Sequence, residues 1–404
     1  MSADTRTIVA FSDPTSGTFR CMLPTLSALA SAGHDVHLFG HASQKAWTER
    51  AGVHFVDMYG RHSLDAADDI TVPVISRYVT FAAVYAEAVT TEVAALGPDV
   101  IVYETFAVIA PLVARRLGVP YVNVVPNPLT IPSVKPVFEQ FPGKVISDAC
   151  KDAVARLRNE HGITNAHPFL WLDGVSPHLN VYCEPEEYLE QSRQAEIQPL
   201  AFAGCLAPEL LPATGASAFA PRDGRTRVYA SFGTFIWVYF AEVAVAALEA
   251  IAASCAELPV DLLITLGGFD LEGRARQRLE GHTGVTVVDF ADQWSALGES
   301  DVFITHHGVN STHEGIYREC PMISYPFFGD QPMLAARCQE LGLATPLAPE
   351  MLAPVEPDAL GAALERIAAD NEGFAERLAG ARQWEQRTCD GRSDVVARIV
   401  SLTS

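Results

Sequence analysis

The sequence predicts an α/β protein built from two doubly wound domains, each a parallel sheet covered by helices. Short apolar runs bounded by glycine or proline alternate with segments of helical periodicity along most of the 404 residues. A small, polar, Pro/Gly-rich segment, Leu211–Arg225, interrupts this alternation, which then starts again. Such alternation is typical of βαβ units, whose parallel strands are buried on both faces. At about 150 residues per domain, the length suits two to three domains.

The first half alternates expected strands and helices. Its helices end at Gly33, Gly97 and Gly118, and glycine readily takes the left-handed conformation that follows a helix. From Asn127 to about Trp171 prolines break the pattern, and we expect an irregular segment. The expected strands are Thr7–Phe11, Val36–Phe39, Val53–Met58, Val100–Tyr103, Tyr121–Val125, Leu179–Cys183 and Pro199–Ala203, and the expected helices are Met22–Ala32, Tyr78–Leu96 and Ala107–Leu117.

The second half repeats the same architecture. We expect an N-terminal domain over residues 1–210, a linker over 211–225, a second domain over 226–380, and a C-terminal helix over 381–404 that packs back on the first domain. The expected strands are Arg227–Ser231, Asp261–Leu266, Val285–Phe290, Val302–His306 and Met322–Tyr325, and the expected helices are Ala241–Ala256, one from Asn310, Gln331–Leu341, Leu360–Ala368 and Phe374–Arg382.

Composition excludes several kinds of partner. The chain carries 28 Lys and Arg against 49 Asp and Glu, a formal net charge of −21. Nucleic acids and anionic membranes are bound by basic surfaces, so neither is expected as a partner. The eight cysteines form no C-x-x-C pair, which favours buried thiols in a reducing compartment. With no apparent signal peptide or long apolar span, we expect a cytoplasmic protein. Its oligomeric state stays open, a homodimer included.

The turn after the strand Val302–Thr305 is a candidate phosphate site. It contains His306 and Gly308, and the helix beyond it starts with Asn310-Ser311-Thr312, residue types that cap helices. A helix N-terminus presents unpaired N–H groups and the positive end of its dipole, so it suits a phosphate. His306 can donate a further hydrogen bond to it. Taken alone, the three capping residues would be an ordinary helix cap.

Side chains beyond this turn suit hydroxyl groups. Glu314 lies one turn along the same helix face and suits two adjacent hydroxyls, such as those of a ribose. Asp330 and Gln331 follow the next strand and suit sugar hydroxyls. Taken alone, Glu314 would be a solvated helix residue. His306, His307 and His313 could also be read as a metal cluster, but no obvious carboxylate or fourth ligand accompanies them, and we expect no metal site.

Together these residues resemble the donor-binding signature of nucleotide-sugar-dependent glycosyltransferases, a family that includes plant secondary-product and bacterial macrolide and antibiotic enzymes. The strongest matches are THHGVNSTHE, residues 305–314, and FFGDQ, residues 327–331. The resemblance extends over nearly the whole chain and is weaker in the first half. It implies the GT-B fold, an α/β architecture of two Rossmann-like doubly wound domains that face a central cleft.

The resemblance also implies roles for individual residues. His306 would hold the diphosphate, Glu314 the ribose, and Asp330 with Gln331 the sugar. The family's base-stacking tryptophan corresponds here to Phe290, and a glycine is frequent in the family where this chain has His307, although a bulkier residue is known there. The implied donor-binding residues are Ser231, Gly233, Thr234, Phe290, Gln293, His306, Gly308, Asn310, Ser311, Glu314, Asp330 and Gln331.

The catalytic positions depart from the family pattern. The family has a G-H-x-x-P loop after its first strand, and the histidine is the general base. The ungapped match here is Gly17-Thr18-Phe19-Arg20-Cys21, so Thr18 stands where the histidine would be. A gapped match to Pro24 would place Cys21 there instead. The family's partner aspartate, at the end of a later strand, corresponds to Glu104.

These departures leave the identity of the base open. A threonine hydroxyl is no base near neutral pH, but the longer carboxylate of Glu104 could take the proton directly or through water. Alternatively, Glu104 caps the next helix or pairs with Arg20. Asp13, at the end of the first strand, is the next candidate. The catalytic candidates are therefore Glu104, Asp13 and Thr18.

The resemblance implies an inverting, metal-independent transfer of a sugar from UDP or TDP to a small acceptor, without a resident cofactor. The acceptor is expected in the first half, under the Pro-rich segment and the loop Ser63–Arg77, whose composition suits a greasy or flat aglycone such as a polyketide. Two alternatives remain: a nucleotide-sugar epimerase on the same fold, and a non-catalytic partner that binds nucleotide-sugar or activates another transferase. The missing histidine favours the last; the intact donor signature opposes it.

Overall fold

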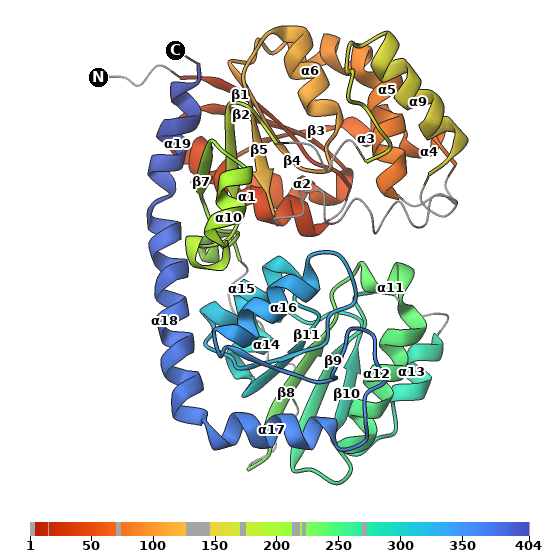
Figure 1. Cartoon of the computed structure of the whole chain (residues 1–404), viewed down its shortest axis with the longest axis vertical. Helices are drawn as coiled ribbons and strands as arrows, with labels where there is room; N and C mark the ends of the chain where they lie inside the picture. Colours follow the sequence, from red (N-terminus) through yellow and green to blue (C-terminus); the bar gives the residue numbers. More distant parts are fainter. Residues whose placement is uncertain are drawn as a thin grey trace. The chain divides into compact units, whose positions relative to one another are not determined.

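The computed structural model describes residues 5–14, 16–69, 74–126, 146–169, 175–211, 219, 224–268 and 273–403 (Figure 1). The chain divides into two compact units. Unit 1 comprises Met1–Leu210 and Arg387–Ser404, and unit 2 comprises Leu211–Gln386. The long helix α18 (Asn371–Asp390) begins in unit 2 and ends in unit 1.

The strands of unit 1 are β1 (Thr7–Phe11), β2 (Asp35–Gly40), β3 (His54–Asp57), β4 (Val100–Glu104), β5 (Tyr121–Val125), β6 (Leu179–Tyr182) and β7 (Leu200–Phe202). They form one parallel sheet in the order β3-β2-β1-β4-β5-β6-β7. All residues of β4 and β5 are buried, as expected for strands with helices on both faces. The strand order reverses between β1 and β4. The carboxyl ends of these two strands are therefore the switch point, where open α/β sheets bind ligands.

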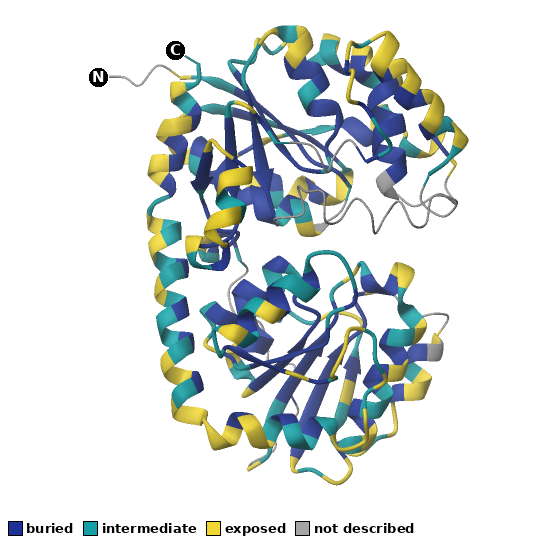
Figure 2. Cartoon of the chain, viewed as in Figure 1, coloured by how far each residue is buried: buried dark blue, intermediate teal, exposed yellow. Residues whose placement is uncertain are grey.

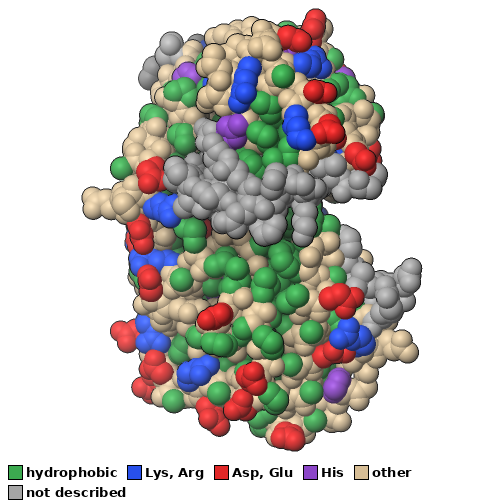
Figure 3. All heavy atoms as spheres, turned by 45° about the vertical axis from the view of Figure 1, so that its right-hand side comes forward, with side chains coloured by type: hydrophobic (Ala, Val, Ile, Leu, Met, Phe, Trp, Pro, Cys, Tyr) green, Lys and Arg blue, Asp and Glu red, His purple; other side chains and the backbone are tan. Residues whose placement is uncertain are grey.

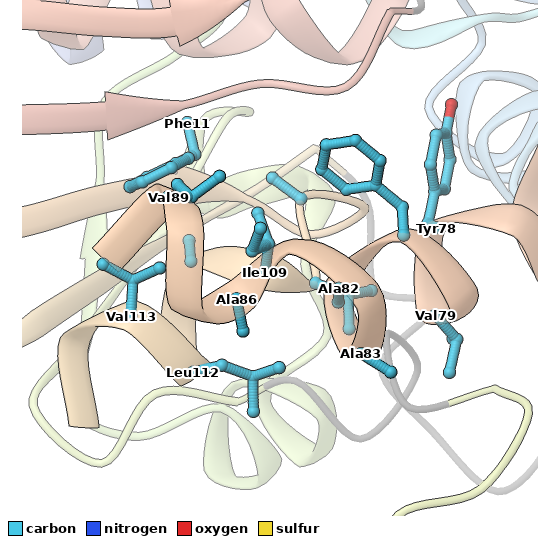
Figure 4. Packing of buried hydrophobic residues seen from close by; sticks show 14 of the residues in the cluster. Phe11, Tyr78, Val79, Ala82, Ala83, Ala86, Val89, Ile109, Leu112 and Val113 are labelled. Atoms are coloured by element: carbon cyan, nitrogen blue, oxygen red, sulfur yellow. The ribbon is translucent and has the colours of Figure 1, made fainter. Parts of the chain in front are cut away.

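The helices of unit 1 are α1 (Ser16–Ser31), α2 (Lys45–Arg50), α3 (Met58–Arg61), α4 (Leu64–Ala67), α5 (Val74–Ala94), α6 (Ile109–Leu117), α9 (Asp148–Asn159), α10 (Gln191–Glu196) and α19 (Arg392–Ser401), with short 3-10 helices at Ala42–Gln44, Glu186–Tyr188 and Pro208–Leu210. Helix α5 packs against α6 and α9. Phe11 of β1, Val89 of α5 and Ile109 of α6 belong to one buried apolar cluster (Figure 4). This cluster holds the helices against one face of the sheet.

The strands of unit 2 are β8 (Thr226–Ser231), β9 (Val260–Thr265), β10 (Val285–Val288), β11 (Val302–Thr305), β12 (Met322–Ser324) and β13 (Ala344–Pro346), and its helices before α18 are α11 (Ile236–Tyr239), α12 (Ala241–Ser254), α13 (Arg274–Leu279), α14 (Gln293–Glu299), α15 (Val309–Tyr317), α16 (Gln331–Glu340) and α17 (Ala359–Ala369). The strands form a parallel sheet in the order β10-β9-β8-β11-β12-β13. The order reverses between β8 and β11, so this sheet has its own switch point. The central strands are buried along their whole length, among them β4 and β5 in unit 1 and β9 and β11 in unit 2, whereas the edge strands β3 and β10 are more exposed (Figure 2).

The α/β class and the two parallel sheets are confirmed, and three local predictions were wrong or incomplete. Helix α1 begins at Ser16 and not at Met22, so Thr18 lies in its first turn and Pro24 inside it. The segment expected to be irregular contains α9, which is capped by the Ser147 hydroxyl accepting from the Cys150 N–H at 2.9 Å. Strand β13 and helix α14 were not expected. The rest of the irregular segment, residues 127–145 and 170–171, lies outside the described residues.

Across the described ranges, no helix combines the length and the hydropathy that crossing a lipid bilayer requires.

Candidate functional site

The switch point of unit 2 brings together the loops that follow β8 and β11. The imidazole of His306, directly after β11, lies between two glycines. A Cβ atom on Gly233 would come within 2.8 Å of His306 Nε2, and one on Gly308 within 2.5 Å. Both distances are shorter than van der Waals contact allows. Glycine at these two positions is therefore what lets the Nε2 edge of His306 lie against the start of α15.

His306 is a neutral hydrogen-bonding group at physiological pH. Burial lowers its pKa to about 4, against a smaller opposing effect of the Ser231 backbone. A neutral imidazole carries one N–H donor and one acceptor nitrogen. His306 can thus donate to an anion without the cost of burying a charge of its own.

The N-terminus of α15 differs from the sequence prediction. Asn310, Ser311 and Thr312 do not cap the helix; they lie within its first turn. The N-cap is Gly308, with φ −64° and ψ 141°, and no side chain makes a capping hydrogen bond to it. Gly308, Asn310 and Ser311 are partly exposed, whereas Thr312 is buried. The positive end of a nine-residue helix therefore reaches the surface beside His306.

His307 stabilises the turn that follows β11. Its φ of 60° lies in the left-handed region that favours glycine, which explains why glycine is frequent here in the resembling family. The buried ring places Nε2 2.8 Å from the Ser324 hydroxyl and Nδ1 3.2 Å from the Thr312 hydroxyl. Burial lowers the pKa of His307 to about 3. Its neutral ring joins the turn to α15 and β12.

The third histidine of the sequence cluster points elsewhere. His313 Nδ1 lies 2.6 Å from Glu385 Oε1 of α18, and both side chains are buried. Throughout the described ranges, no three His, Cys, Asp or Glu side chains are arranged to hold a metal ion.

The side chain of Gln293 is hydrogen-bonded to those of Ser311 and Glu314 in the N-terminal part of α15. The Gln293 amide Nε2 donates to Glu314 Oε2 at 2.7 Å and to the Ser311 hydroxyl at 3.2 Å. Gln293 opens α14, whereas the other two lie on α15, so one amide fixes both helices and the buried Glu314 carboxylate. This geometry places a buried carboxylate close to the N-terminal part of α15.

Phe290 is an exposed ring at the same edge of the sheet. Its side chain is 69% exposed, the largest value among the exposed large hydrophobic residues of the described chain. Strand β10 ends at Val288, so Phe290 belongs to the following loop and not to the strand as expected. The ring lies on Gly268, where a Cβ atom would approach it to 2.5 Å. The Cζ and Cε2 atoms of the ring thus lie against the backbone at Gly268, and the exposed ring is of a kind that can stack on a planar base.

Asp330 and Gln331 occupy the start of α16. Asp330 is the partly exposed N-cap residue, whereas Gln331 is buried. The Gln331 side-chain oxygen accepts from the backbone N–H groups of Phe327 at 3.0 Å and Phe328 at 3.3 Å. Gln331 therefore holds the loop in place, which sequence reasoning did not anticipate, and only its amide nitrogen is left to contact a sugar.

Aromatic rings adjoin this loop. Phe328 stacks on Phe235 and on Phe240, with ring centroids 5.5 Å apart in each pair. Val238 and Tyr239, on α11, are exposed. Hydrophobic side chains gather on the face of unit 2 in the lower part of Figure 3.

Two further predicted donor-binding residues precede α11. Ser231 ends strand β8 and is buried, whereas Thr234 lies in the loop that follows and is exposed.

The switch point of unit 1 collects the three catalytic candidates. Asp13 and Glu104 are fully buried at the ends of β1 and β4, and Thr18 is half-buried on α1. The Thr18 hydroxyl donates to Asp13 Oδ1 at 2.7 Å, and the Tyr78 hydroxyl donates to Asp13 Oδ2. The Gln44 amide donates to the Asp13 carbonyl at 2.5 Å. Tyr78 and Gln44 were missed because only the folded chain brings them here.

Glu104 bridges backbone groups. Its Oε1 accepts from the Asp13 N–H and its Oε2 from the Phe106 N–H, each at 2.8 Å. Burial, and then the charge of Asp13, raise the pKa of Glu104 well above its usual range, against smaller opposing effects of backbone hydrogen bonds. Arg20 lies over the Trp47 ring, 5.3 Å from its centroid. These contacts favour the capping role of Glu104 and leave Asp13 as the carboxylate next to Thr18.

Acidification should destabilise unit 2 through His306 and His307. Their folded pKa values, about 4 and about 3, lie below the unfolded value of 6.5. Between these limits the unfolded chain binds more protons, so stability present above pH 6.5 is lost as the pH falls. The expected loss is about 1.4 kcal/mol per pH unit per histidine. Urea unfolding at pH 7, 6 and 5, followed by tryptophan fluorescence, measures it.

The variant His307→Asn is the matched control, because asparagine tolerates a positive φ and does not titrate. It should lower stability at pH 7 and flatten the pH dependence by one histidine's share. An identical pH dependence in both proteins would remove His307 from this account.

The sequence and the fold resemble those of known glycosyltransferases. A sequence model of the family described as UDP-glucoronosyl and UDP-glucosyl transferase matches residues 215–373. Zeaxanthin glucosyltransferase of Pantoea ananas is 32% identical over 130 residues, which are 31% of this chain and 28% of that protein. UDP-glycosyltransferase 87A2 of Arabidopsis thaliana is 39% identical over 106 residues, 26% of this chain and 22% of that protein. These matches span less than a third of either relative.

Solved structures match over nearly the full length. The glycotransferase of kitacinnamycin has a TM-score of 0.78 at 21% identity and covers 100% of both chains. The calicheamicin glycosyltransferase CalG4 has a TM-score of 0.72 at 20% identity and covers 99% of this chain and 98% of its own. At such identities the likeness concerns the fold, which is the GT-B arrangement that the sequence predicted.

Proposed function

We propose that this chain transfers a sugar from a nucleoside diphosphate to a small-molecule acceptor, and the match of residues 215–373 to the family described as UDP-glucoronosyl and UDP-glucosyl transferase supports this proposal. The observation that carries the proposal is the His306 ring held between Gly233 and Gly308 at the N-terminus of α15. The backbone of Gly233 has a φ of 70°, which itself favours glycine, whereas Gly308 has a φ of −64°, which any residue adopts. Glycine at position 308 is therefore explained by the close approach of the His306 ring, and an anion on the helix end would accept a hydrogen bond from a ring in this position.

The surrounding residues divide the nucleotide-sugar among them. The diphosphate would lie on His306 and the N–H groups of Gly308, Asn310 and Ser311. The ribose would meet the Glu314 carboxylate, which Gln293 orients, and the base would stack on Phe290. The sugar would meet Asp330 and the amide of Gln331. Donor binding is thereby assigned to unit 2, and removal of the acceptor proton to Asp13 and its neighbours in unit 1.

The chemistry proposed is a direct displacement with inversion at the anomeric carbon. The acceptor oxygen bonds to that carbon as the bond to the diphosphate oxygen breaks, and the electron pair leaves with the nucleoside diphosphate. The neutral His306 N–H and the positive end of α15 would stabilise this developing charge, as preorganised donors do in other enzymes. Two matched structures, of the glycosyltransferases VinC and SsfS6, contain thymidine diphosphate, which supports TDP beside UDP as the nucleotide.

The matched structures include the kitacinnamycin glycotransferase, the calicheamicin glycosyltransferase and the spinosyn forosaminyltransferase. These names support a natural product as the acceptor of this chain. In unit 1 the ring of Phe106 lies 6.2 Å from that of Tyr78 and is only partly buried. Aromatic surfaces beside Asp13 suit an apolar or flat aglycone.

Calorimetric titration with UDP and TDP in the presence of EDTA tests the donor assignment. At least one diphosphate should bind without added metal, and mass spectrometry should detect slow hydrolysis of the corresponding nucleotide-sugar. If neither diphosphate binds, the assignment of His306 and Glu314 is lost. If binding occurs only when a divalent cation replaces EDTA, the metal-independent form of the proposal is lost.

A further inference from the structure

Three consecutive side chains of α15 contact three different parts of unit 2. Thr312 contacts the turn after β11, and Glu314 accepts from the amide at the start of α14. Between them in sequence, His313 Nδ1 donates to Glu385 Oε1 of α18 at 2.6 Å. Successive side chains on a helix point about 100° apart, so these contacts hold α15 from three directions.

The His313–Glu385 pair is buried at a position where an apolar contact would serve stability as well. The two side chains are 0% and 1% exposed. The other buried residues of α18 recur at helical spacing: Phe374, Leu378 and Ala381. Glu385 therefore stands where this apolar stripe would place a fourth hydrophobic residue. A buried charge loses its hydration, and apolar residues of similar volume often stabilise a protein equally or better. What the pair adds is direction, because a hydrogen-bonded pair holds two helices in one register.

We infer that Glu385 is a positioning residue for the donor site, and that it acts through His313 on the orientation of α15. The inference rests on the proposed function and deepens it, since it makes the affinity for a nucleoside diphosphate depend on helix α18. Both side chains are buried, so their effect must pass through the helix and not through contact with the ligand.

Helix α15 is short, so its orientation at His313 governs the whole proposed donor site. The helix has nine residues, and at about 1.5 Å per residue His313 lies about 6 Å along the axis from its first residue, Val309. A rotation of α15 would move Glu314 away from Gln293. The same rotation would turn the first N–H groups of the helix away from His306. One misplaced helix would thus weaken both the ribose and the diphosphate contacts that we propose.

Helix α18 continues from this contact into unit 1. Glu385 belongs to unit 2, whereas Arg387, two residues later, belongs to unit 1 and forms an ion pair with Glu187. Coupling between two contacts is reciprocal. If the contact of α18 with α15 raises diphosphate affinity, bound diphosphate must strengthen that contact by the same factor. Nucleotide binding should therefore stabilise the last turns of α18.

Replacement of the whole pair by leucine separates positioning from stability. Glu385→Leu alone removes the carboxylate from the buried His313, so the urea midpoint of unfolding should clearly fall. The double variant His313→Leu/Glu385→Leu should regain the stability of the natural protein or exceed it. Its affinity for UDP or TDP, measured by calorimetry, should nevertheless be about 5- to 150-fold lower, the usual range of coupling between sites.

Two further variants serve as controls. Glu385→Gln keeps an oxygen that can accept from His313, so it should retain most of the diphosphate affinity. Arg382→Ala removes an exposed ion pair of 3.0 Å between α18 and Glu319, and it should leave the affinity unchanged. A double leucine variant that binds diphosphate as tightly as the natural protein would show a purely structural pair and overturn the inference. An equal loss of affinity in Arg382→Ala would overturn it as well, because any weakening of α18 would then have the same effect.

Amide hydrogen exchange tests the coupling in the natural protein, without any substitution. Whichever diphosphate binds should slow exchange in residues 381–390 of α18, and the double leucine variant should lose this effect. Unchanged exchange in these residues with diphosphate bound overturns the inference and leaves the donor assignment intact. If the natural protein binds neither UDP nor TDP, the donor assignment itself fails, and the inference fails with it.

Discussion

Replacing Asp13 with asparagine should lower kcat about 10²- to 10⁴-fold, the usual contribution of a positioned proton acceptor. Asparagine keeps the size of the side chain, and its oxygen can still accept one hydroxyl hydrogen bond, but it cannot take up a proton. Asp13 lies in unit 1, whereas the proposed donor residues lie in unit 2. The affinity for UDP or TDP should therefore be unchanged, as calorimetry can measure beside steady-state transfer to a small-molecule acceptor.

Glu104→Gln separates this expectation from the interpretation that the sequence alone favoured. Both Glu104 oxygens accept backbone N–H groups, so the amide of glutamine would face one of those donors. Stability should fall by about 1–3 kcal/mol while the folded protein keeps its turnover. Loss of turnover in a fully folded Glu104→Gln protein, with activity retained in Asp13→Asn, would assign the base to Glu104.

Replacing His306 with alanine should lower kcat about 10²- to 10³-fold, the effect of removing one preorganised donor to a developing charge. Diphosphate affinity should fall as well, because a hydrogen bond to a charged group contributes about 1.5–3 kcal/mol. The ring fills the space between Gly233 and Gly308, so its loss also frees the turn. Steady-state transfer and diphosphate titration on the same preparation measure both effects.

Two further variants test whether the His306 ring itself causes this loss of affinity. Gly308→Ala would place a Cβ atom 2.5 Å from His306 Nε2, so it should reproduce the loss of affinity by displacing the ring. His307→Asn should lower the stability of unit 2 without a matching loss of affinity, since His307 contacts Ser324 and Thr312 inside the unit. If diphosphate affinity depended on His307 and not on His306, the anion site would have to be redrawn around the neighbouring turn.

The closeness of the predicted donor-binding residues could be expected because they follow strands of one parallel sheet. Parallel strands deliver their carboxyl ends to a common edge, where Gln293 and Glu314 are hydrogen-bonded and where His306 also follows a strand. The residue that caps α15 was predicted incorrectly. Asn310 and Ser311 are good capping residues, yet Gly308 begins the helix because a side chain there would strike His306.

The catalytic site of unit 1 was less accessible to sequence reasoning. The position of Thr18 came from matching a loop, but its partner depends on how α1, α5 and β1 pack. Tyr78 lies on α5 in a run of buried residues and has no sequence signature that separates it from core aromatics. Glu104 was predicted as a base because it replaces the family's aspartate, and its two backbone partners favour a capping role instead.

Helix α9 was missed for a related reason. The segment before the helix is rich in proline. The helix itself has a low mean hydropathy, and only four of its residues are buried: Cys150, Ala153, Val154 and Leu157. These four residues recur at helical spacing, but a pattern this short is hard to separate from an irregular loop. Its docking partner, α5, supplies the burial that the sequence of α9 does not display.

The discontinuity of unit 1 bears on how the protein is made. All seven strands of its sheet precede Ala203, yet α19, which packs against α1, is synthesised only after unit 2. The Arg392 guanidinium bonds to the carbonyls of Ala203 and Leu206, and Arg398 to that of Leu200. We therefore expect that unit 2 can fold during synthesis before α19 has been made. Until α19 is synthesised, the part of unit 1 that it covers stays exposed.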